Sequence, residues 1–272
     1  MSVTQGKAFD PKAYWEKRLG EEYSLHGVGY AAMGLNYNQA LYRIRGRVFR
    51  RTARPLVADP ASCKVLDIGA GTGFYVDAWL GLGVKEITGL DITETAVSHL
   101  REAYPALQFV VADIGDETVP LAAASFDVIS AFDVLFHIVD DERYARAIEN
   151  LFRLLKPGGF LIWSDNFLHN GQRAAANVQV SRSLESSSRC LRDAGFEIVR
   201  RRPMFVLMNA PVDSESRLAR AWWRLLHGAV RRSEVAGKVL GAILTPPELI
   251  LTRAKHESPT TELMICRKPA AS

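Results

Sequence analysis

The segment VLDIGAGTG, residues 65–73, joins a short apolar run to three closely spaced glycines. Glycines at such a turn let the backbone bend tightly and approach a ligand without side chains in the way. The spacing is G-x-G-x-G, and Phe74 stands where a dinucleotide fingerprint has its third glycine. No Lys-Ser or Lys-Thr pair follows, which argues against a P-loop. Asp67 would repel a pyrophosphate but suits a cationic ligand that carries an ammonium and a sulfonium.

Two further carboxylates follow the next two apolar runs. Asp91, in the segment GLDI, could accept both hydrogens of a ribose diol. Thr93 is available to cap the helix that follows, which favours a ligand role for Asp91. Asp113 could accept a hydrogen bond from an adenine amine while Ile114 packs on the ring, although Asp113 alone fits a loop carboxylate equally well.

Short apolar runs alternate with helical segments from residue 61 to about 205, which predicts βαβ units and a mostly parallel sheet. The tetrad KPGG at 156–159 predicts a helix stop and a turn into the next strand. The predicted strands are 64–68, 86–90, 108–111, 126–131, 160–163 and 196–199, and the helices between them are 73–82, 94–103, 141–155 and 181–194.

The flanking regions have a different pattern. An amphipathic helix is predicted over 38–54, with arginines outside its apolar stripe. Another is predicted over 217–232, and an apolar stretch then ends before Thr245-Pro246-Pro247. The run 261–266 predicts a returning strand. The predicted segments are a helical N-terminal extension (1–60), a core (61–205), a helical insertion (206–258) and a last strand with its tail (259–272).

Taken in order, five blocks over residues 64 to about 165 resemble the class I S-adenosylmethionine-dependent methyltransferases. They are VLDIGAGTG, GLDI, VVADI, SFDVISAFDVLFHI and LFRLLKPGGFLIWSD. The resemblance implies an α/β, Rossmann-like, doubly wound sheet of seven strands, mostly parallel with an antiparallel last strand. It also implies a helical N-terminal lid and a helical insertion before that strand.

The same resemblance implies that S-adenosyl-L-methionine is the cofactor. The methionine end would contact Asp67, Gly69 and Gly71, the ribose Asp91, and the adenine Asp113 with Ile114. An N-terminal lid helix would add Tyr14 and Arg18. Ala70, Ile92 and Phe132 complete the expected cofactor contacts.

A hydroxyl acceptor would require a base near the end of the fourth strand. His137 is the candidate, with Asp133 as its partner, and a structural role in bracing the loop is the alternative. Asp165, on the same rim, could orient a base or substrate, or cap a turn. A cation held by Asp133, Asp165 and Asn166 is less favoured than a metal-free site.

The insertion carries Trp222 and Trp223, which are expected to cover the acceptor pocket. A helix lying on a membrane surface is the alternative, since Arg231 and Arg232 would suit a headgroup boundary. No run of 18 apolar residues predicts a membrane-spanning segment. The N-terminus lacks the features of a secretory signal, and three separated cysteines indicate reduced thiols, so we expect a cytoplasmic protein.

The net charge of +4 and the pI near 9.0 are compatible with an anionic partner. However, the excess of basic over acidic residues is small, and no aromatic residues alternate with the basic ones as they would in a surface that stacks nucleic-acid bases. We therefore expect a small-molecule acceptor and no stable nucleic-acid partner. The segment 10–54 and the tail TELMICRK look like those of methyltransferases of glycan and natural-product pathways, which implies a sugar or secondary-metabolite hydroxyl. An RNA methyltransferase and a non-catalytic cofactor-binding scaffold are the alternatives.

Overall fold

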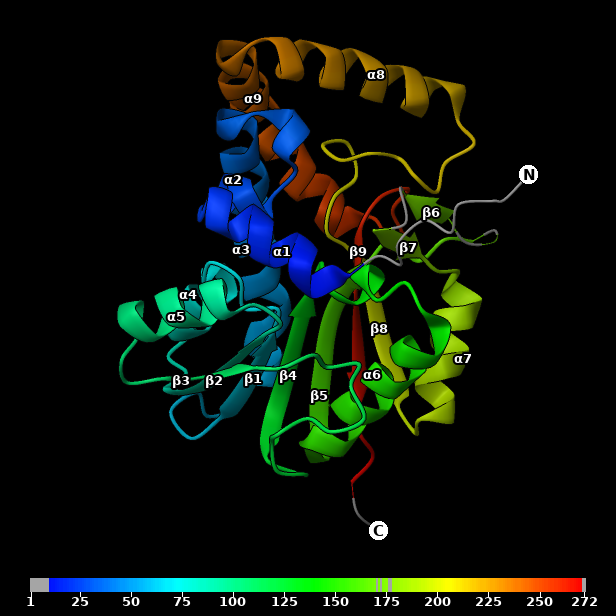
Figure 1. Cartoon of the computed structure of the whole chain (residues 1–272). Coiled ribbons are helices and arrows are strands. Elements are labelled where there is room, and N and C mark those ends of the chain that lie inside the picture. Colours follow the sequence, from blue (N-terminus) through cyan, green and yellow to red (C-terminus); the bar gives the residue numbers. More distant parts are fainter. Residues whose placement is uncertain (1–9, 170, 172, 176–177, 271–272) are drawn as a thin grey trace, which may run out of the picture.

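A seven-stranded sheet forms the centre of the molecule, in the order β3-β2-β1-β4-β5-β9-β8 (Figure 1). The computed structural model describes residues 10–169, 171, 173–175 and 178–270, so 1–9 and 271–272 of the predicted flanking segments lie outside the described residues. Strands β1 to β5 pair in parallel, and β9 runs antiparallel to both β5 and β8. This confirms the predicted sheet with its antiparallel last strand. The strands are β1 (Lys64–Ile68), β2 (Glu86–Asp91), β3 (Gln108–Val111), β4 (Phe126–Phe132), β5 (Leu155–Asp165), β8 (Glu197–Pro203) and β9 (Glu262–Arg267).

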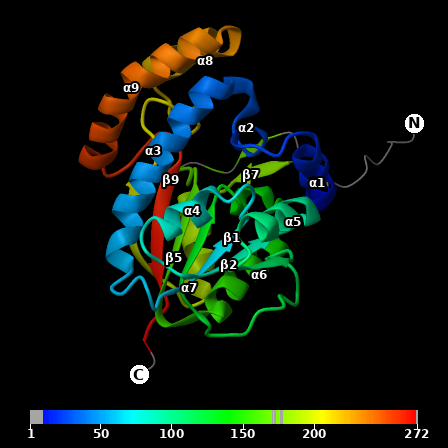
Figure 2. The same ribbon diagram turned by 90° about the vertical axis from the view of Figure 1, so that its left-hand side faces the viewer.

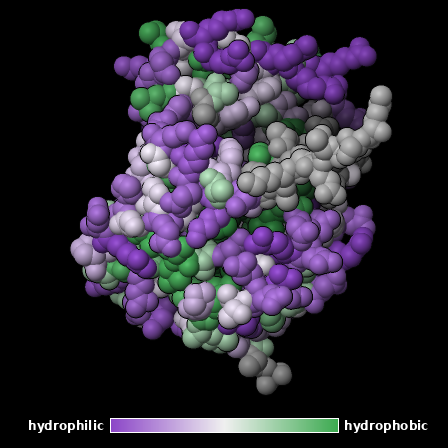
Figure 3. Space-filling view, in the orientation of Figure 1, coloured by the Kyte–Doolittle hydropathy of each residue, from purple (hydrophilic) through white to green (hydrophobic). Residues whose placement is uncertain are grey.

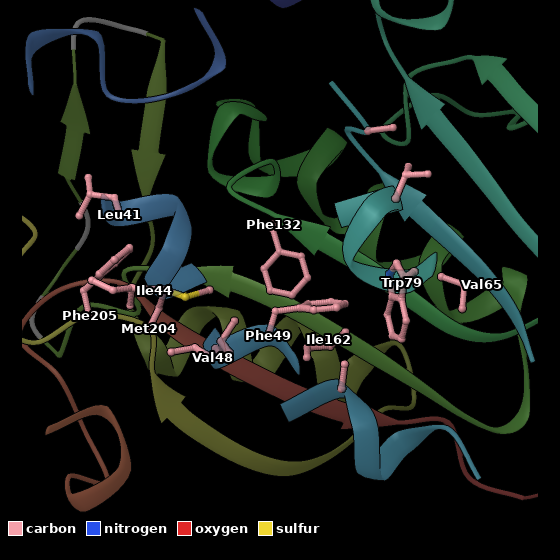
Figure 4. Packing of buried hydrophobic residues seen from close by; sticks show 14 of the residues in the cluster. Leu41, Ile44, Val48, Phe49, Val65, Trp79, Phe132, Ile162, Met204 and Phe205 are labelled. Atoms are coloured by element: carbon pink, nitrogen blue, oxygen red, sulfur yellow. The ribbon is translucent and has the colours of Figure 1, made fainter. Parts of the chain in front are cut away.

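Helices cover both faces of this sheet, because successive side chains of a strand point to opposite faces. Val65 and Ile162 pack on the face covered by α3, α4 and α5, whereas Leu66 and Leu161 pack on the face covered by α6 and α7. Figure 4 shows the first core, where Phe49 of α3 lies between Trp79 of α4 and Phe132 of β4. The helices are α1 (Pro11–Glu21), α2 (Leu25–Val28), α3 (Leu35–Ala53), α4 (Phe74–Leu80), α5 (Glu94–Ala103), α6 (Asp141–Leu154), α7 (Leu184–Asp193), α8 (Arg217–Arg232) and α9 (Glu234–Ala254), with short 3-10 turns at Ala31–Met33, Arg54–Leu56 and Leu135–His137.

Helix α1 reaches the carboxyl ends of the parallel strands. The carboxylate of Glu16 accepts hydrogen bonds of 3.0 Å from the backbone N–H groups of both Glu94 and Thr95, at the start of α5. These N–H groups have no partner within their own helix, so Glu16 fastens α1 to the first turn of α5. The N-terminal segment is thereby held over the edge of the sheet where the glycine loop lies.

Helix α9 runs unbroken through Pro246 and Pro247, where the sequence predicts the end of an apolar stretch. Proline inside a helix removes a backbone donor and crowds the preceding turn, so packing must stabilise the helix here. A Cβ on Gly241 would lie 2.7 Å from Cβ of Ala40, which shows how closely α9 approaches α3. Figures 1 and 2 both show α3 and α9 side by side. Tertiary packing thus overrides the local proline signal.

Two other features differ from the predictions. A small hairpin of β6 (Arg173–Ala175) and β7 (Gln179–Ser181) precedes α7, where the sequence predicts no strand. By length and composition alone, α9 is long and apolar enough to cross a membrane, and it is the one such helix in the described part of the chain. Helix α9 meets this criterion of length and composition although it contains no run of 18 apolar residues, so the search of the sequence for such a run did not detect it.

Candidate cofactor and acceptor site

The loop after β1 makes the tight turn that its glycines predict. Gly69 and Gly71 have φ of +67° and +52°, a region that favours glycine. A Cβ on Gly69 would lie 2.3 Å from a methyl carbon of Val134, so no larger residue fits there. The N–H groups of Gly69 and Ala70 both donate to the carbonyl of Leu90, at 2.7 and 3.1 Å, which ties the loop to β2.

A cavity with mostly apolar walls lies beside this loop, at the carboxyl ends of the parallel strands. Doubly wound sheets bind their ligands at this position. The structure brings ten of the predicted site residues to its wall: Gly69, Ala70, Gly71, Asp91, Ile92, Asp113, Ile114, Phe132, Asp133 and His137. The described residues that line the cavity do not include Asp67, Tyr14, Arg18 or Asp165.

Asp91 ends β2 and is almost fully buried beside the glycine loop. Its Oδ2 accepts a hydrogen bond of 2.9 Å from the N–H of Gly71, and its Oδ1 accepts from the N–H and the hydroxyl of Thr93 at 3.0 and 2.7 Å. Burial raises the pKa of Asp91, and these hydrogen bonds oppose the shift. Each carboxylate oxygen has two lone pairs, so the contact with Gly71 leaves Oδ2 able to accept from a ligand hydroxyl.

Asp67 lies behind the glycine loop. It shares the face of β1 with Val65, because side chains of a strand repeat every two residues, and that face is covered by α3 and α4. The hydroxyl of Ser130 donates to Asp67 at 2.6 Å, and the indole N–H of Trp79 donates to Ser130 at 3.0 Å. Burial raises the pKa of Asp67 to about 7. The carboxyl group therefore supports the loop from the protein interior.

Asp113 follows β3 and has partners of its own. Arg143 of α6 forms an ion pair of 2.7 Å with Asp113, and the N–H of Gly115 donates to the other carboxylate oxygen at 2.7 Å. Arg143 also lines the cavity. Nothing in the sequence pattern distinguishes this arginine from the other charged residues of its helix.

His137 lines the cavity from the short turn after β4. Its Nδ1 lies 2.9 Å from the carbonyl oxygen of Val178, so Nδ1 carries the proton and donates it there. The neutral ring then has its lone pair on Nε2. Burial lowers the pKa of His137, which favours this neutral form. The Trp15 ring of α1 packs edge-on against the imidazole, with 5.0 Å between centroids.

Asp133 lies next to this turn, but the described contacts pair it with Arg45 of α3 and not with His137. The hydroxyl of Ser164 donates to Asp133 Oδ1 at 2.9 Å and accepts from the Asp133 N–H at 2.8 Å. Asp133 has a φ of +58°, which is uncommon for a residue other than glycine. The sequence could have identified Arg45, since it lies four residues from both Leu41 and Phe49 of the apolar stripe.

Asp165 is 2 % exposed and lies away from the cavity wall. The N–H of Asn166 donates to its Oδ1 at 2.6 Å, and burial raises its pKa to about 7. Its position therefore fits a capping role better than contact with an acceptor. Among the described residues, no three His, Cys, Asp or Glu side chains gather closely enough to hold a metal ion.

The lid helix contributes its apolar face. Trp15 and Leu19 line the cavity, whereas Arg18 donates to the carbonyl of Gly29 at 2.7 Å and to the hydroxyl of Tyr14 at 3.3 Å. A helix presents Trp15 and Leu19 on one side because they are four residues apart. Arg18 instead fixes α1 to the turn after α2.

Trp222 and Trp223 of α8 also lie outside the described cavity wall. The indole N–H of Trp222 donates to the carbonyl of Leu207 at 3.0 Å, and Trp223 stacks on Tyr30 with 6.3 Å between centroids. The insertion packs along α3 through α9, and α8 packs against α9 and the 3-10 turn at Ala31–Met33.

The cavity has the features that a sulfonium nucleoside requires. The hydroxyl oxygen of Thr72 is buried at its wall and has no hydrogen-bond partner among the described residues, so it can serve a ligand. The glycine turn exposes backbone, and Asp91 and Asp113 offer acceptors along one side. These groups fit the ribose, the adenine amine and the cationic amino-acid end.

Comparison with known proteins supports this assignment. Residues 66–163 match the family model described as a methyltransferase domain. The chain is 31% identical over 139 residues to a probable S-adenosylmethionine-dependent methyltransferase of Mycolicibacterium smegmatis, covering 49% of this chain and 52% of that one. It is 32% identical over 111 residues to a ubiquinone biosynthesis O-methyltransferase of Thiobacillus denitrificans, covering 38% and 44%. The chain thus spans about half the length of these curated relatives.

One solved structure aligns along nearly the whole chain. It is the 1,6-didemethyltoxoflavin-N1-methyltransferase of Burkholderia thailandensis with bound 1,6-didemethyltoxoflavin and S-adenosylhomocysteine. The alignment covers 98% of this chain and 94% of that one, with a TM-score of 0.54 and 17% identity. At this identity, the likeness concerns the fold alone. The ordered motifs, the sheet and the matched family model together identify residues 66–163 as a class I S-adenosylmethionine-dependent methyltransferase domain.

Proposed function

We propose that this chain transfers the methyl group of S-adenosyl-L-methionine to a hydroxyl oxygen of a small molecule, such as a sugar or a secondary metabolite. The observation that carries the proposal is His137, a neutral imidazole at the cavity wall whose proton is fixed on Nδ1 by Val178. Nε2 can then accept the proton that a hydroxyl acceptor loses.

The cofactor, when bound, supplies an activated methyl group on a positively charged sulfur. Transfer to an oxygen would break the C–S bond as the O–C bond forms, so residues that position the acceptor would account for much of the rate effect. Phe132 and Trp15 contribute apolar wall that excludes water from the reacting atoms. His137 takes the hydroxyl proton at Nε2, and Arg45 holds Asp133 in place beside it.

The relatives support a small acceptor. One of them is named for ubiquinone biosynthesis and O-methylation. Trp15 and Leu19 narrow the cavity from the lid side, which suits a small ligand better than a nucleic acid.

Calorimetry on the purified chain tests the first step. We expect S-adenosylhomocysteine to bind with a micromolar Kd, on the order of −8 kcal/mol, and NAD to give no heat of binding. Release of S-adenosylhomocysteine is then measured with a panel of hydroxylated sugars, phenols and quinols, beside matched amines. Tight NAD binding would overturn the cofactor assignment, and turnover of the amines alone would overturn the hydroxyl acceptor.

A further inference from the structure

The basic charge of the chain is concentrated in one segment. Residues 217–255, which contain α8 and α9, carry eight arginines and lysines against two glutamates, a net charge of +6. The whole chain has a net charge of +4, so all other residues together carry −2. The eight cations are Arg217, Arg220, Arg224, Arg231, Arg232, Lys238, Arg253 and Lys255.

Helix α9 also presents an apolar face to the outside. Val235, Val239, Ile243 and Ile250 are 72%, 49%, 62% and 63% exposed, and their spacing places them on one side of the helix. The opposite side, with Gly237, Gly241 and Leu244, is the buried one. On ordinary protein surfaces, exposed hydrophobic residues occur singly and scattered. A continuous row of large hydrophobic side chains on the outer face of a helix therefore indicates an interaction surface.

Helix α8 adds a second exposed apolar row. Leu218 and Leu225 are 83% and 73% exposed, and Trp222 between them is 38% exposed. Ser233 alone separates α8 from α9, and the two helices pack against each other, so the two rows belong to one helical unit. Figures 1 and 2 show this unit at the end of the molecule opposite the C-terminus.

By helical spacing, Arg232 lies beside the exposed row of α8, and Lys238 and Arg253 lie beside the outer row of α9. Three other arginines lie on a different side of α8. Arg217, Arg220 and Arg224 line an open groove together with Trp223 and residues 210–212. In Figure 3, strongly hydrophilic residues lie along the top of the molecule, where Figure 1 shows α8. No acidic residue occurs within α8 itself. The groove therefore offers several guanidinium groups to an anion without a competing carboxylate from the helix.

We propose that the α8–α9 unit docks on an anionic membrane surface. The arginines would contact lipid phosphates, while Leu218, Trp222, Leu225 and the outer row of α9 enter the boundary between headgroups and acyl chains. A second copy of the chain would bring the same positive charge and be repelled. RNA would use the arginines but leave the apolar rows without a partner.

The rest of α9 shows why the unit lies on the membrane and does not cross it. Glu248 is fully buried, and its carboxylate accepts hydrogen bonds from the backbone N–H groups of Val206 and Leu207 at 2.7 and 2.9 Å. Gly241 lies in close contact with α3. Insertion of α9 across a bilayer would break both contacts and place a carboxylate in hydrocarbon.

Sedimentation with lipid vesicles tests the proposal without any cofactor, so its outcome is independent of the proposed methyl transfer. The vesicles contain phosphatidylcholine alone, or phosphatidylcholine and phosphatidylglycerol in equal parts. We expect at least tenfold tighter binding to the mixed vesicles, and weaker binding as salt is raised. The double variant Arg220→Gln/Arg224→Gln should bind roughly tenfold more weakly, and Val239→Asn/Ile243→Asn should lose a similar factor.

The control variants make the same kinds of substitution on other parts of the surface. Arg189→Gln/Arg192→Gln removes the same charge from the exposed side of α7, and Val199→Asn replaces an apolar side chain that is 53% exposed on β8. Both should bind as the wild type does, and circular dichroism checks that all variants are folded. Absence of wild-type binding, or an equal loss in the controls, would overturn the proposal. Normal binding by the apolar variants would also overturn it, because a polyanion such as RNA would then be the better partner. A wild-type dimer that the apolar variants abolish would overturn it as well, because the apolar rows would then join two copies of the chain.

Discussion

Arg45 of α3 forms an ion pair with Asp133, which directly follows β4 and lies 88 positions later in the chain. Burial lowers the pKa of Arg45, but the Asp133 carboxylate together with Tyr75 and Tyr42 more than offsets this effect, so the pKa is raised. The pair joins the N-terminal helical segment to the end of the fourth strand, next to His137. The lid helices and the candidate catalytic turn are therefore mechanically connected.

Replacing Arg45 by methionine should destabilise the protein by about 2 kcal/mol, because it leaves a partly buried carboxylate without its partner. Urea unfolding measures this free energy. The double variant Arg45→Met/Asp133→Asn should recover part of the loss, since no unpaired charge remains. Arg50→Met, on the exposed side of the same helix, is the control and should change stability little. Equal losses for Arg45→Met and Arg50→Met would show that the ion pair contributes nothing.

Asp91→Asn should weaken the binding of S-adenosylhomocysteine by about 2 kcal/mol, because one buried acceptor becomes a donor that faces ribose hydroxyls and backbone N–H groups. Calorimetry gives the affinity directly. Glu86→Gln changes a carboxylate at the opposite, exposed end of the same strand and should leave the affinity unchanged. If Asp91→Asn also bound normally, the ribose would have to lie elsewhere.

His137→Ala and His137→Gln should each lower turnover by roughly a hundredfold while the affinity for S-adenosylhomocysteine barely changes. A base must be neutral, so wild-type turnover should rise with pH and then level off. Because burial lowers the pKa of His137, the midpoint should lie below the ordinary value of 6.5. The measurement is a pH profile of turnover with an accepted substrate.

A purely structural role for His137 gives a different pattern. Both variants would then melt at lower temperature, while turnover per folded molecule stayed near that of the wild type. A midpoint above 6.5 would also exclude this histidine as the base. Asp133, which lines the same cavity, would then be the next residue to test.

Asp67 should make the ligand-free protein less stable as pH rises. Its pKa is raised to about 7 in the folded state and is about 3.9 when unfolded, so its protonated form stabilises the fold at low pH and that contribution is lost as pH rises through 7. Asp67→Asn should therefore gain about 2 kcal/mol relative to wild type between about pH 5 and pH 8. Asp193→Asn, exposed at the end of α7, should show no such gain. Parallel pH curves for wild type and Asp67→Asn would refute the shift.

The sheet could be predicted because characteristic residues mark the carboxyl ends of its first three strands. Glycines follow β1, and single carboxylates mark the ends of β2 and β3, so local sequence and tertiary position agree. The cavity wall followed from the same signals, since residues at the carboxyl ends of parallel strands meet at one edge. The two-residue repeat of side chains along a strand also places Asp67 on the same buried face as Val65. The glycine motif by itself had instead suggested that Asp67 contacts the ligand.

The remaining features depend on contacts between distant segments. The spacing of Arg45 places it near the apolar stripe, but its partner Asp133 is known only from the folded structure, and α9 continues through two prolines because α3 supports it. Val178 is unremarkable in sequence, yet its carbonyl sets the tautomer of His137. Backbone acceptors of this kind leave no trace in residue type, so only the folded structure reveals them.

The position of β9 has a consequence for synthesis of the protein. β8 is an edge strand that joins the sheet by pairing with β9, although α8 and α9 separate the two in the chain. During translation, β8 and both helices therefore emerge before the strand that attaches them to β5. Until residues 262–267 leave the ribosome, the nascent chain exposes the flank of β5 together with the apolar helices, a state that chaperones would recognise.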